Sequence, residues 1–177
     1  MSEPRRVRVL NSWVETFDTA SFLDTVAAGA RRDRQTLIAN HNVNSLTIFQ
    51  KDERFRELFD VADHCFVDGM GVLAISKLEG TGLSSRNRIA VLDWIWPLFE
   101  RAEQEGWRIT HLGAKPSTID AARAAILERY PKLALTTLDG YFDFTKMGAQ
   151  ALVGLIDGLD PEGKSRSLQA TRESMDS

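Results

Sequence analysis

Two short apolar runs, each followed at once by polar residues, constrain the fold of this chain more than any other feature. The run LIA at residues 37–39 leads into NHN at 40–42, and the run CFV at 65–67 leads into DG at 68–69. Short apolar runs of this kind, flanked by helical patterns, are typical of buried parallel strands. Because α/β proteins bind ligands at the carboxyl ends of such strands, we expect Asn40, Asn42 and Asp68 to border a binding site.

The remainder of the chain alternates between strand and helix patterns. Further strands are predicted at residues 7–14, 107–112 and 133–138. Helices are predicted at residues 18–29, 43–62 with a break at 51–53, 69–78, 89–104, 117–130 and 145–159. This order predicts an α/β fold with a mainly parallel sheet and helices on both of its faces.

Two of these helices carry more specific expectations. We expect the helix at 69–78 to bury Met70, Leu73, Ala74 and Leu78. The helix at 89–104 contains Pro97, which predicts a kink or a new helix start at that position.

Composition and charge narrow the class of protein. Of the 177 residues, 43% are hydrophobic and 27% are charged, as in an ordinary soluble globular protein. The net charge of −3 is spread along the chain, which argues against a nucleic-acid partner. Cys65 is the only cysteine and lies in an apolar run, which favours a buried thiol in a cytoplasmic protein. No apolar run approaches the ~20 residues that a membrane span needs.

The end of the chain has a different composition. Residues 1–160 read as one α/β domain, whereas residues 161–177 are polar and are expected to be disordered. No strand pattern follows the predicted helix at 145–159, so the sheet is expected to be incomplete at the C-terminus.

Several polar residues next to the predicted strand ends have two interpretations. Asp68 can act as a general base or can cap the helix that follows it. Asn40 and Asn42 can bind ligand hydroxyl groups or serve as turn and capping residues. Gly69 permits close approach of a ligand to the backbone, at a helix N-terminus that favours anions. Arg88 is suited to a diphosphate and equally to a surface ion pair.

Two positions in the second half of the chain are also candidates. Gly113 lies between a predicted strand and a predicted helix, which is a weak indication of phosphate binding. Tyr141 follows another predicted strand end and can stack on a ligand ring or cover the sheet. The histidines His41, His64 and His111 are interpreted as packed or surface residues, and no metal site is predicted.

Five blocks of the sequence together resemble the WecG/TagA/CpsF family of bacterial glycosyltransferases. They are IANHNVNSL at 38–46, ADHCFVDGMGV at 62–72, RIAVLDWI at 88–95, ITHLGAKP at 109–116 and ERYPKLALTTLDGYFD at 128–143. The resemblance implies a Rossmann-like fold and inverting transfer of a sugar from a UDP-sugar to a polyprenyl-diphosphate-linked acceptor. It also implies a role in surface polysaccharide synthesis at the cytoplasmic face of the membrane, without a metal or other cofactor.

The resemblance assigns roles to individual positions of this chain. It implies that Asp68 is the catalytic base and that Asn40 is the strand-end asparagine of the donor site. The other residues expected to bind substrate are Asn42, Gly69, Arg88, Asp93, Gly113 and Tyr141. One departure concerns Ile38, because the family usually has a threonine two residues before the strand-end asparagine.

A second departure concerns the C-terminus. Members of the family continue with a strand, a Gly-x-Pro-x-Gln-Glu block and a basic end that contacts the membrane, but in this chain the resemblance stops near Pro161. We therefore expect a C-terminally truncated member whose tail from Glu162 reflects a frameshift or unrelated sequence. The alternative to an active transferase is an inactive remnant that binds only a nucleotide or a partner subunit. An unpaired sheet edge would also favour a homo-oligomer.

Overall fold

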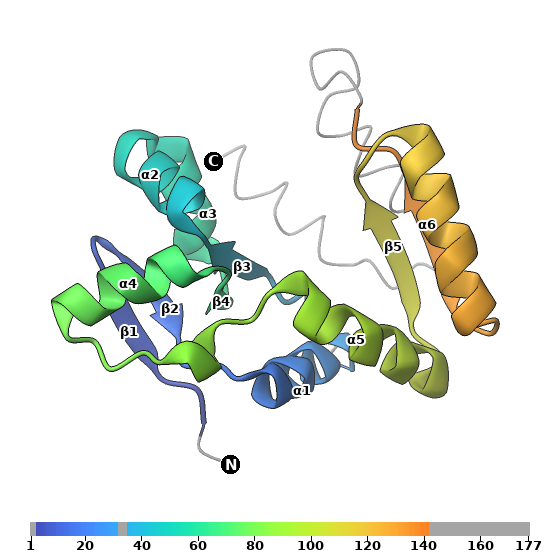
Figure 1. The fold of residues 1–177 in the computed structure, drawn as a ribbon, viewed down its shortest axis with the longest axis horizontal. Coiled ribbons are helices and arrows are strands. Elements are labelled where there is room, and N and C mark those ends of the chain that lie inside the picture. The colour runs from blue at the N-terminus through green and yellow to red at the C-terminus, as the bar shows by residue number, and fades with distance from the viewer. Residues whose placement is uncertain (1–2, 32–34, 142–177) are drawn as a thin grey trace, which may run out of the picture. The chain divides into compact units, whose positions relative to one another are not determined.

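The computed structural model describes residues 3–31 and 35–141, and Figure 1 shows their fold. The predicted helix at 145–159 and the polar tail at 161–177 lie outside the described residues. The chain divides between Leu98 and Phe99 into two compact units. The described elements are β1 (Arg6–Val9), β2 (Ser12–Glu15), α1 (Thr19–Ala30), β3 (Ile38–His41), α2 (Val43–Lys51), α3 (Glu53–Val61), β4 (His64–Val67), α4 (Met70–Glu79), η1 (Ser85–Asn87), α5 (Val91–Glu105), β5 (Arg108–Leu112), α6 (Pro116–Arg129) and β6 (Ala134–Leu138).

The first two strands show that the prediction of one strand over residues 7–14 was wrong. β1 and β2 pair antiparallel, with Val7 opposite Val14, and the chain reverses at Leu10 and Asn11. Leu10 has a φ of 54°, which is uncommon for a residue other than glycine. Both carboxylate oxygens of Glu79 accept a hydrogen bond from the Leu10 N–H, at 3.1 and 3.0 Å. A residue far away in the sequence therefore holds this turn.

The strand pair β3–β4 confirms the two strands predicted at 37–39 and 65–67. The strands are parallel, and their register runs from Ile38 opposite His64 to His41 opposite Val67. On the other side of β4, Val67 forms a parallel bridge with Arg88, and its carbonyl accepts a hydrogen bond from Ile89 N at 2.8 Å. The segment after η1 therefore lies beside β4, and the mixed α/β class is confirmed.

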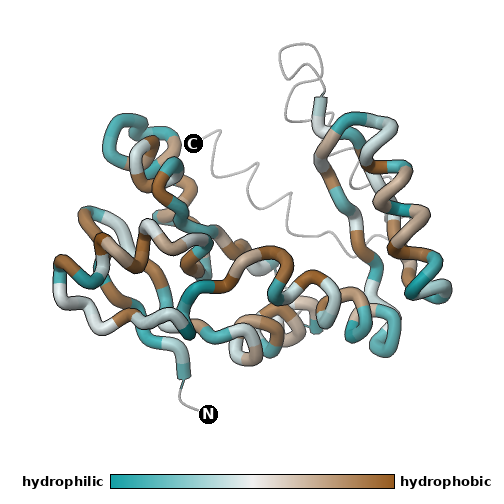
Figure 2. The backbone as a smooth tube through the Cα atoms, viewed as in Figure 1, coloured by the Kyte–Doolittle hydropathy of each residue, from teal (hydrophilic) through white to brown (hydrophobic). Residues whose placement is uncertain are grey.

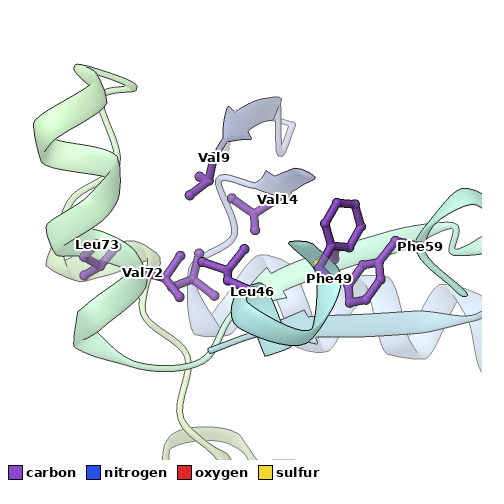
Figure 3. Close-up of a cluster of buried hydrophobic side chains, with 9 residues drawn as sticks. Val9, Val14, Leu46, Phe49, Phe59, Val72 and Leu73 are labelled. Atoms are coloured by element: carbon purple, nitrogen blue, oxygen red, sulfur yellow. The ribbon is translucent and has the colours of Figure 1, made fainter. Parts of the chain in front are cut away.

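Strand β4 is covered on both faces, which explains its apolar sequence. Cys65 and Val67 belong to a cluster that the hairpin, α2, α3 and α4 share, and Figure 3 draws its nine buried residues and labels seven of them. Phe66 faces the other way, toward Phe22 of α1 and Ile89. Burial raises the pKa of the Cys65 thiol to about 12, so this cysteine is the inert buried residue that the sequence predicts. Each large apolar side chain buried in these clusters contributes roughly 1.5–3 kcal/mol.

Helix α4 presents a different face to the core than the sequence predicts. Its buried residues are Val72, Leu73 and Ser76. Met70 and Leu78 are 61% and 89% exposed, and Ala74 is exposed as well, so three of the four expected core positions were wrong. The helix carries apolar residues around most of its circumference, and its rotation is fixed by contacts with other elements.

Two other features of the helices agree with the sequence in part. Asp52 separates α2 from α3, and its side chain accepts a hydrogen bond from Phe55 N, which confirms the predicted break. Helix α5 contains Pro97 in its interior, and no new helix starts there. No helix formed by the described residues is both long and apolar enough to cross a membrane.

In the second unit, β5 and β6 form another parallel pair connected through α6. Their register runs from Arg108 opposite Ala134 to Leu112 opposite Leu138. Hydropathy alternates along α6 between hydrophilic and hydrophobic residues, as Figure 2 shows, and its buried residues are Ile119 and Ile126. This unit confirms the strands predicted near 107–112 and 133–138.

Candidate functional site

The parallel register brings the first candidate residues to one edge of the β3–β4 pair. Asp68 N donates to the His41 carbonyl at 2.8 Å, which extends the ladder one step beyond the strands. Asn42 and Asp68 are therefore neighbours at the carboxyl ends of β3 and β4, as predicted. A Cβ built on Gly69 would lie 4.0 Å from the Asn42 Cβ, so the two turns approach each other closely.

Asn40 lies one step further back, within β3. It is paired with Phe66, and the alternation of a strand places it on the face opposite the buried His41. Ile38, the residue that departs from the family pattern, lies on the same face as Asn40 and packs against the cluster around Phe66.

Asn42 caps helix α2. Its side-chain oxygen accepts a hydrogen bond from Ser45 N at 2.9 Å, and the Ser45 hydroxyl accepts one from Asn42 N at 2.8 Å. This is a reciprocal capping box, and it satisfies backbone donors that a helix start leaves without partners. The capping interpretation of Asn42 is thus confirmed, and its side chain is held in a defined orientation.

Asp68 does not cap helix α4. The residue at the capping position is Gly69, with φ 121° and ψ 150°, and no side chain bonds to the first amides of this helix. This backbone conformation is essentially restricted to glycine. Within residues 3–31 and 35–141 the half-buried Asp68 carboxyl forms no hydrogen bond or ion pair, although its backbone is fixed. The edge thus combines a carboxylate with a helix N-terminus that lacks a side-chain cap and favours anions.

Arg88 and Asp93 reach the same edge together. The parallel bridge to Val67 places Arg88 beside the end of β4. Its guanidinium forms an ion pair of 3.2 Å with the Asp93 carboxylate, and both side chains are about one third exposed. The same carboxylate oxygen also accepts a hydrogen bond from Ala90 N at 2.9 Å, just before α5. The structure therefore shows the ion pair that the sequence left as one alternative for Arg88.

The remaining candidates belong to the second unit. Gly113 follows β5 with a φ of 154°, and its N–H donates to the Leu138 carbonyl at 3.0 Å. Tyr141 follows β6, and the residue is 72% exposed. Both residues lie at the carboxyl ends of the β5–β6 pair, which is the type of position that the sequence predicts for them.

The first edge, meaning the carboxyl ends of β3 and β4 with Asn42 and Asp68, lies above a buried polar group. The sequence assigned no role in the site to this group. His41 is fully buried and stacks on Phe59 with a ring-centroid distance of 4.1 Å. Its two ring nitrogens lie 2.7 Å from the Ser12 hydroxyl and 3.0 Å from the Ser45 hydroxyl. Burial lowers the pKa of His41 to about 4, so the ring is neutral at pH 7. His41 is therefore a packed residue, which is one of the two alternatives that the sequence left open for the histidines.

The His41 side chain links the buried core to the candidate site through a hydrogen bond with Ser45. Ser45 contacts His41 and also completes the capping box of Asn42, so the orientation of Asn42 depends on the core beneath it. The three-residue spacing from Asn42 to Ser45 is a helix-start signal and could have been recognised in the sequence. The contact from His41 to Ser12 joins residues 29 positions apart, and no local pattern indicates it.

Another pair of ionisable side chains, His64 and Glu15, lies at the opposite end of the β3–β4 pair, where the strands begin. His64, the first residue of β4, lies 2.9 Å from the largely buried Glu15 carboxylate of β2. This interaction ties the hairpin to the amino end of β4 and is remote from the candidate edge by the length of the strand.

Comparison with known protein families identifies a family to which most of the chain is similar. The model described as "Glycosyl transferase WecG/TagA/CpsF family" matches residues 7–162, which is most of the chain. The matched range contains every candidate residue of both units.

Proposed function

The chain belongs to the WecG/TagA/CpsF glycosyltransferase family, and we propose that it transfers a sugar from a UDP-sugar to a polyprenyl-diphosphate-linked acceptor. Membership makes the protein a glycosyltransferase of cell-surface polysaccharide synthesis. The proposed donor sugar is a hexose or an N-acetylhexosamine-type sugar. The proposal depends most on Asp68. Its carboxylate lies at the end of a strand and forms no hydrogen bond or ion pair with any described residue, and the N-terminus of the helix beside it has no side-chain cap.

In the proposed mechanism Asp68 is the general base. Its carboxylate removes the proton from the acceptor hydroxyl while that oxygen attacks the anomeric carbon of the donor. The bond from this carbon to the diphosphate breaks, UDP leaves with the electron pair, and the configuration inverts. A positioned base of this kind contributes about 10²–10⁴-fold to the rate. A carboxylate already committed to capping a helix would be a poorer base, so the missing cap bond supports this assignment.

The same edge offers groups that suit a diphosphate leaving group. The first amides of α4 have no side-chain cap, and Gly69 adds no side chain that would block a phosphate. Arg88 is about one third exposed, and we propose that it exchanges part of its ion pair with Asp93 for a phosphate oxygen. Backbone dipoles and a guanidinium then stabilise the developing charge, and the proposal includes no metal or cofactor.

The remaining candidate residues are proposed to bind the sugar donor. We propose that Asn40 and the amide group of Asn42 bind donor hydroxyls, because one lies on β3 and the other starts α2 at the same edge. We further propose that Gly113 permits close approach of the donor and that Tyr141 stacks on uracil, since Tyr141 is largely exposed. A lipid-linked acceptor implies that the protein acts at the cytoplasmic face of a membrane.

The experiment uses the 177-residue chain with a panel of UDP-sugars and a polyprenyl-diphosphate-linked sugar. We expect one UDP-sugar to be converted to UDP and lipid-linked product, with and without EDTA. The anomeric configuration of the product, measured by NMR, tests inversion. An Asp68→Asn variant should bind UDP but form product at least 100-fold more slowly.

The outcomes separate the proposal from its alternative. Equal rates for the wild type and Asp68→Asn would remove Asp68 as the base. UDP binding without product from any donor would support a chain that only binds nucleotide. Loss of activity in EDTA, restored by a divalent cation, would contradict the metal-independent mechanism.

A further inference from the structure

Helices α2 and α4 touch at their first turns, next to the candidate base. A Cβ built on Gly71 would lie 2.1 Å from the Val43 Cγ2 and 3.6 Å from the Val43 Cβ. Atoms at a separation below 3.0 Å cannot coexist, so one of the two residues would have to move. Val43 directly follows Asn42, and Gly71 lies three residues after Asp68. The contact therefore joins the two turns that carry candidate site residues.

The backbone conformation does not explain why residue 71 is glycine. Gly71 lies in the first turn of α4, and its φ is outside the range that favours glycine. Helix propensity alone favours alanine at such a position. What remains is the lack of space, because the Val43 methyl group occupies the volume that a side chain at residue 71 would need.

We propose that the contact between Gly71 and Val43 adds to the β3–β4 ladder in fixing how the side chains of Asn42 and Asp68 lie relative to each other, so that Gly71 is a positioning residue for sugar transfer. The inference rests on the proposed function, because it assigns Asn42 to the donor and Asp68 to the acceptor hydroxyl. In this role Gly71 itself contacts no reacting group.

Each side of the contact lies within three residues of a site residue whose backbone is held, so a shift at the contact has to be taken up by the short segments between them. Asn42 is held by its capping box with Ser45, and Ser45 contacts the buried His41. Asp68 is held by its backbone bond to the His41 carbonyl at 2.8 Å. Val43 is β-branched, and in a helix such a side chain strongly prefers one rotamer. An added methyl group therefore moves the start of α4 or forces Val43 out of its preferred rotamer.

The test compares the wild type with Gly71→Ala, Val43→Ala and the double variant, by thermal melting, UDP titration and steady-state kinetics. We expect Gly71→Ala to lower the melting temperature by about 5 °C, despite the higher helix propensity of alanine. We also expect kcat to fall at least tenfold, with a smaller change in the donor KM. Adding Val43→Ala should restore both the melting temperature and kcat, because it removes the Cγ2 methyl group.

A strained variant at the other end of α4 provides the control. Gly80 has a φ of 68°, and no atom lies within 4 Å of a Cβ built on it. Gly80→Ala should lower the melting temperature through backbone strain, yet leave kcat unchanged at temperatures well below the transition. If Gly80→Ala lowers kcat as much as Gly71→Ala does, the effect at Gly71 is only a loss of stability and the inference is wrong.

Failure of the inference and failure of the proposed function give different results. If the wild type transfers sugar and Gly71→Ala keeps its kcat, or Val43→Ala does not restore it, the positioning role is wrong. If the wild type transfers no sugar, the proposed function fails. The melting temperatures and UDP affinities of the variants then test whether the contact between Gly71 and Val43 matters. An unchanged melting temperature and UDP affinity in Gly71→Ala would then overturn the inference as well.

Discussion

Two strands of this protein are each followed by the dipeptide Asp-Gly, and the aspartate has a different environment in each of the two turns. Strand β4 is followed by Asp68-Gly69, and strand β6 is followed by Asp139-Gly140. In the second turn the Asp139 carboxylate accepts a hydrogen bond from Tyr141 N at 3.0 Å, so the turn itself engages the acid. In the first turn the Asp68 carboxylate has no such bond within the described residues.

The difference follows from what each turn packs against. Gly140 N donates to the Ala114 carbonyl at 2.9 Å, and a Cβ on Gly140 would lie 2.9 Å from the Gly113 Cα. That turn is closed by its own side chain and by the neighbouring loop. After Asp68 the chain enters α4 at once, and Gly69 takes the capping position in a conformation restricted to glycine. In an Asp-Gly pair, the carboxylate is thus available to a ligand only where the turn itself does not form a hydrogen bond with it.

The largest expected effect distinguishes the two acids. Asp68→Asn should reduce kcat by about 10²–10⁴-fold, because it removes the proposed base. Asp139→Asn should keep most of the activity and stability, since asparagine can close the same type of turn. Initial rates and thermal melts of both variants test this. Equal losses of kcat would mean that the two Asp-Gly turns are not functionally distinct.

The second prediction concerns the support beneath each edge. Strand β3 ends in the buried His41, whereas β5 ends in Leu112, which is 42% exposed. The pKa of His41 is about 4 when folded, below its ordinary value of 6.5, so the unfolded chain binds more protons between these values. The stabilisation is fully present above pH 6.5 and is lost as the pH falls toward 4, by about 3 kcal/mol in total.

Urea unfolding of the wild type and His41→Gln at pH values from 4 to 7.5 measures this dependence. Comparison at each pH cancels the contributions of the other titrating groups. The difference in unfolding free energy between the two proteins should shrink as the pH falls. A constant difference over this range would contradict the assignment of a neutral, buried His41 beneath the first edge.

The third prediction concerns the two glycines of the turns. Gly69→Ala places a side chain in a conformation restricted to glycine and should cost about 1–3 kcal/mol. Gly69→Asn should be no better, because the φ and ψ of Gly69 lie outside the left-handed helical region that asparagine tolerates. At Gly140 the obstacle is the Gly113 backbone, so the cost there should rise with side-chain size from alanine to valine. Chemical denaturation of the four variants measures these costs, and a fully stable Gly69→Asn would refute the distinction.

The smallest effect concerns the cation beside the first turn. Arg88→Ala breaks a partly exposed ion pair and should change the unfolding free energy by no more than about 1 kcal/mol. If Arg88 binds the diphosphate, the Kd for UDP should nevertheless rise about tenfold, and Arg88→Lys should recover only part of the loss. Calorimetric titration with UDP at low and high salt tests this, and an unchanged Kd would leave Arg88 with a structural role alone.

The sequence predicts which residues lie at the first edge because each of them directly follows its own apolar strand. Parallel strands align their carboxyl ends, so an apolar run followed by Asn42 and another followed by Asp68 suffices to make these residues neighbours. The sequence does not decide whether Asp68 caps α4. That depends on the φ and ψ of Gly69, and an Asp-Gly pair permits several turns.

Other features escaped prediction because they depend on distant residues. Leu10 gives no turn signal, and its positive φ is held by Glu79, 69 positions later. The inward face of α4 could not be predicted from its composition, because apolar residues surround the helix and its rotation depends on packing against other elements, such as the close approach of Gly71 to Val43. The position of Arg88 beside β4 rests on one bridge that no periodic pattern reveals.

The bond from Glu79 to the Leu10 turn has a consequence for biosynthesis. Synthesis reaches the hairpin before it reaches the carboxylate that completes the turn, which follows 69 residues later. At about 5–20 residues per second, that interval is roughly 3–14 s. Until then the nascent hairpin lacks the acceptor for its Leu10 N–H. The turn between β1 and β2 is therefore expected to gain its last hydrogen bond only after α4 has been synthesised, and the translation speed between residues 10 and 79 sets that interval.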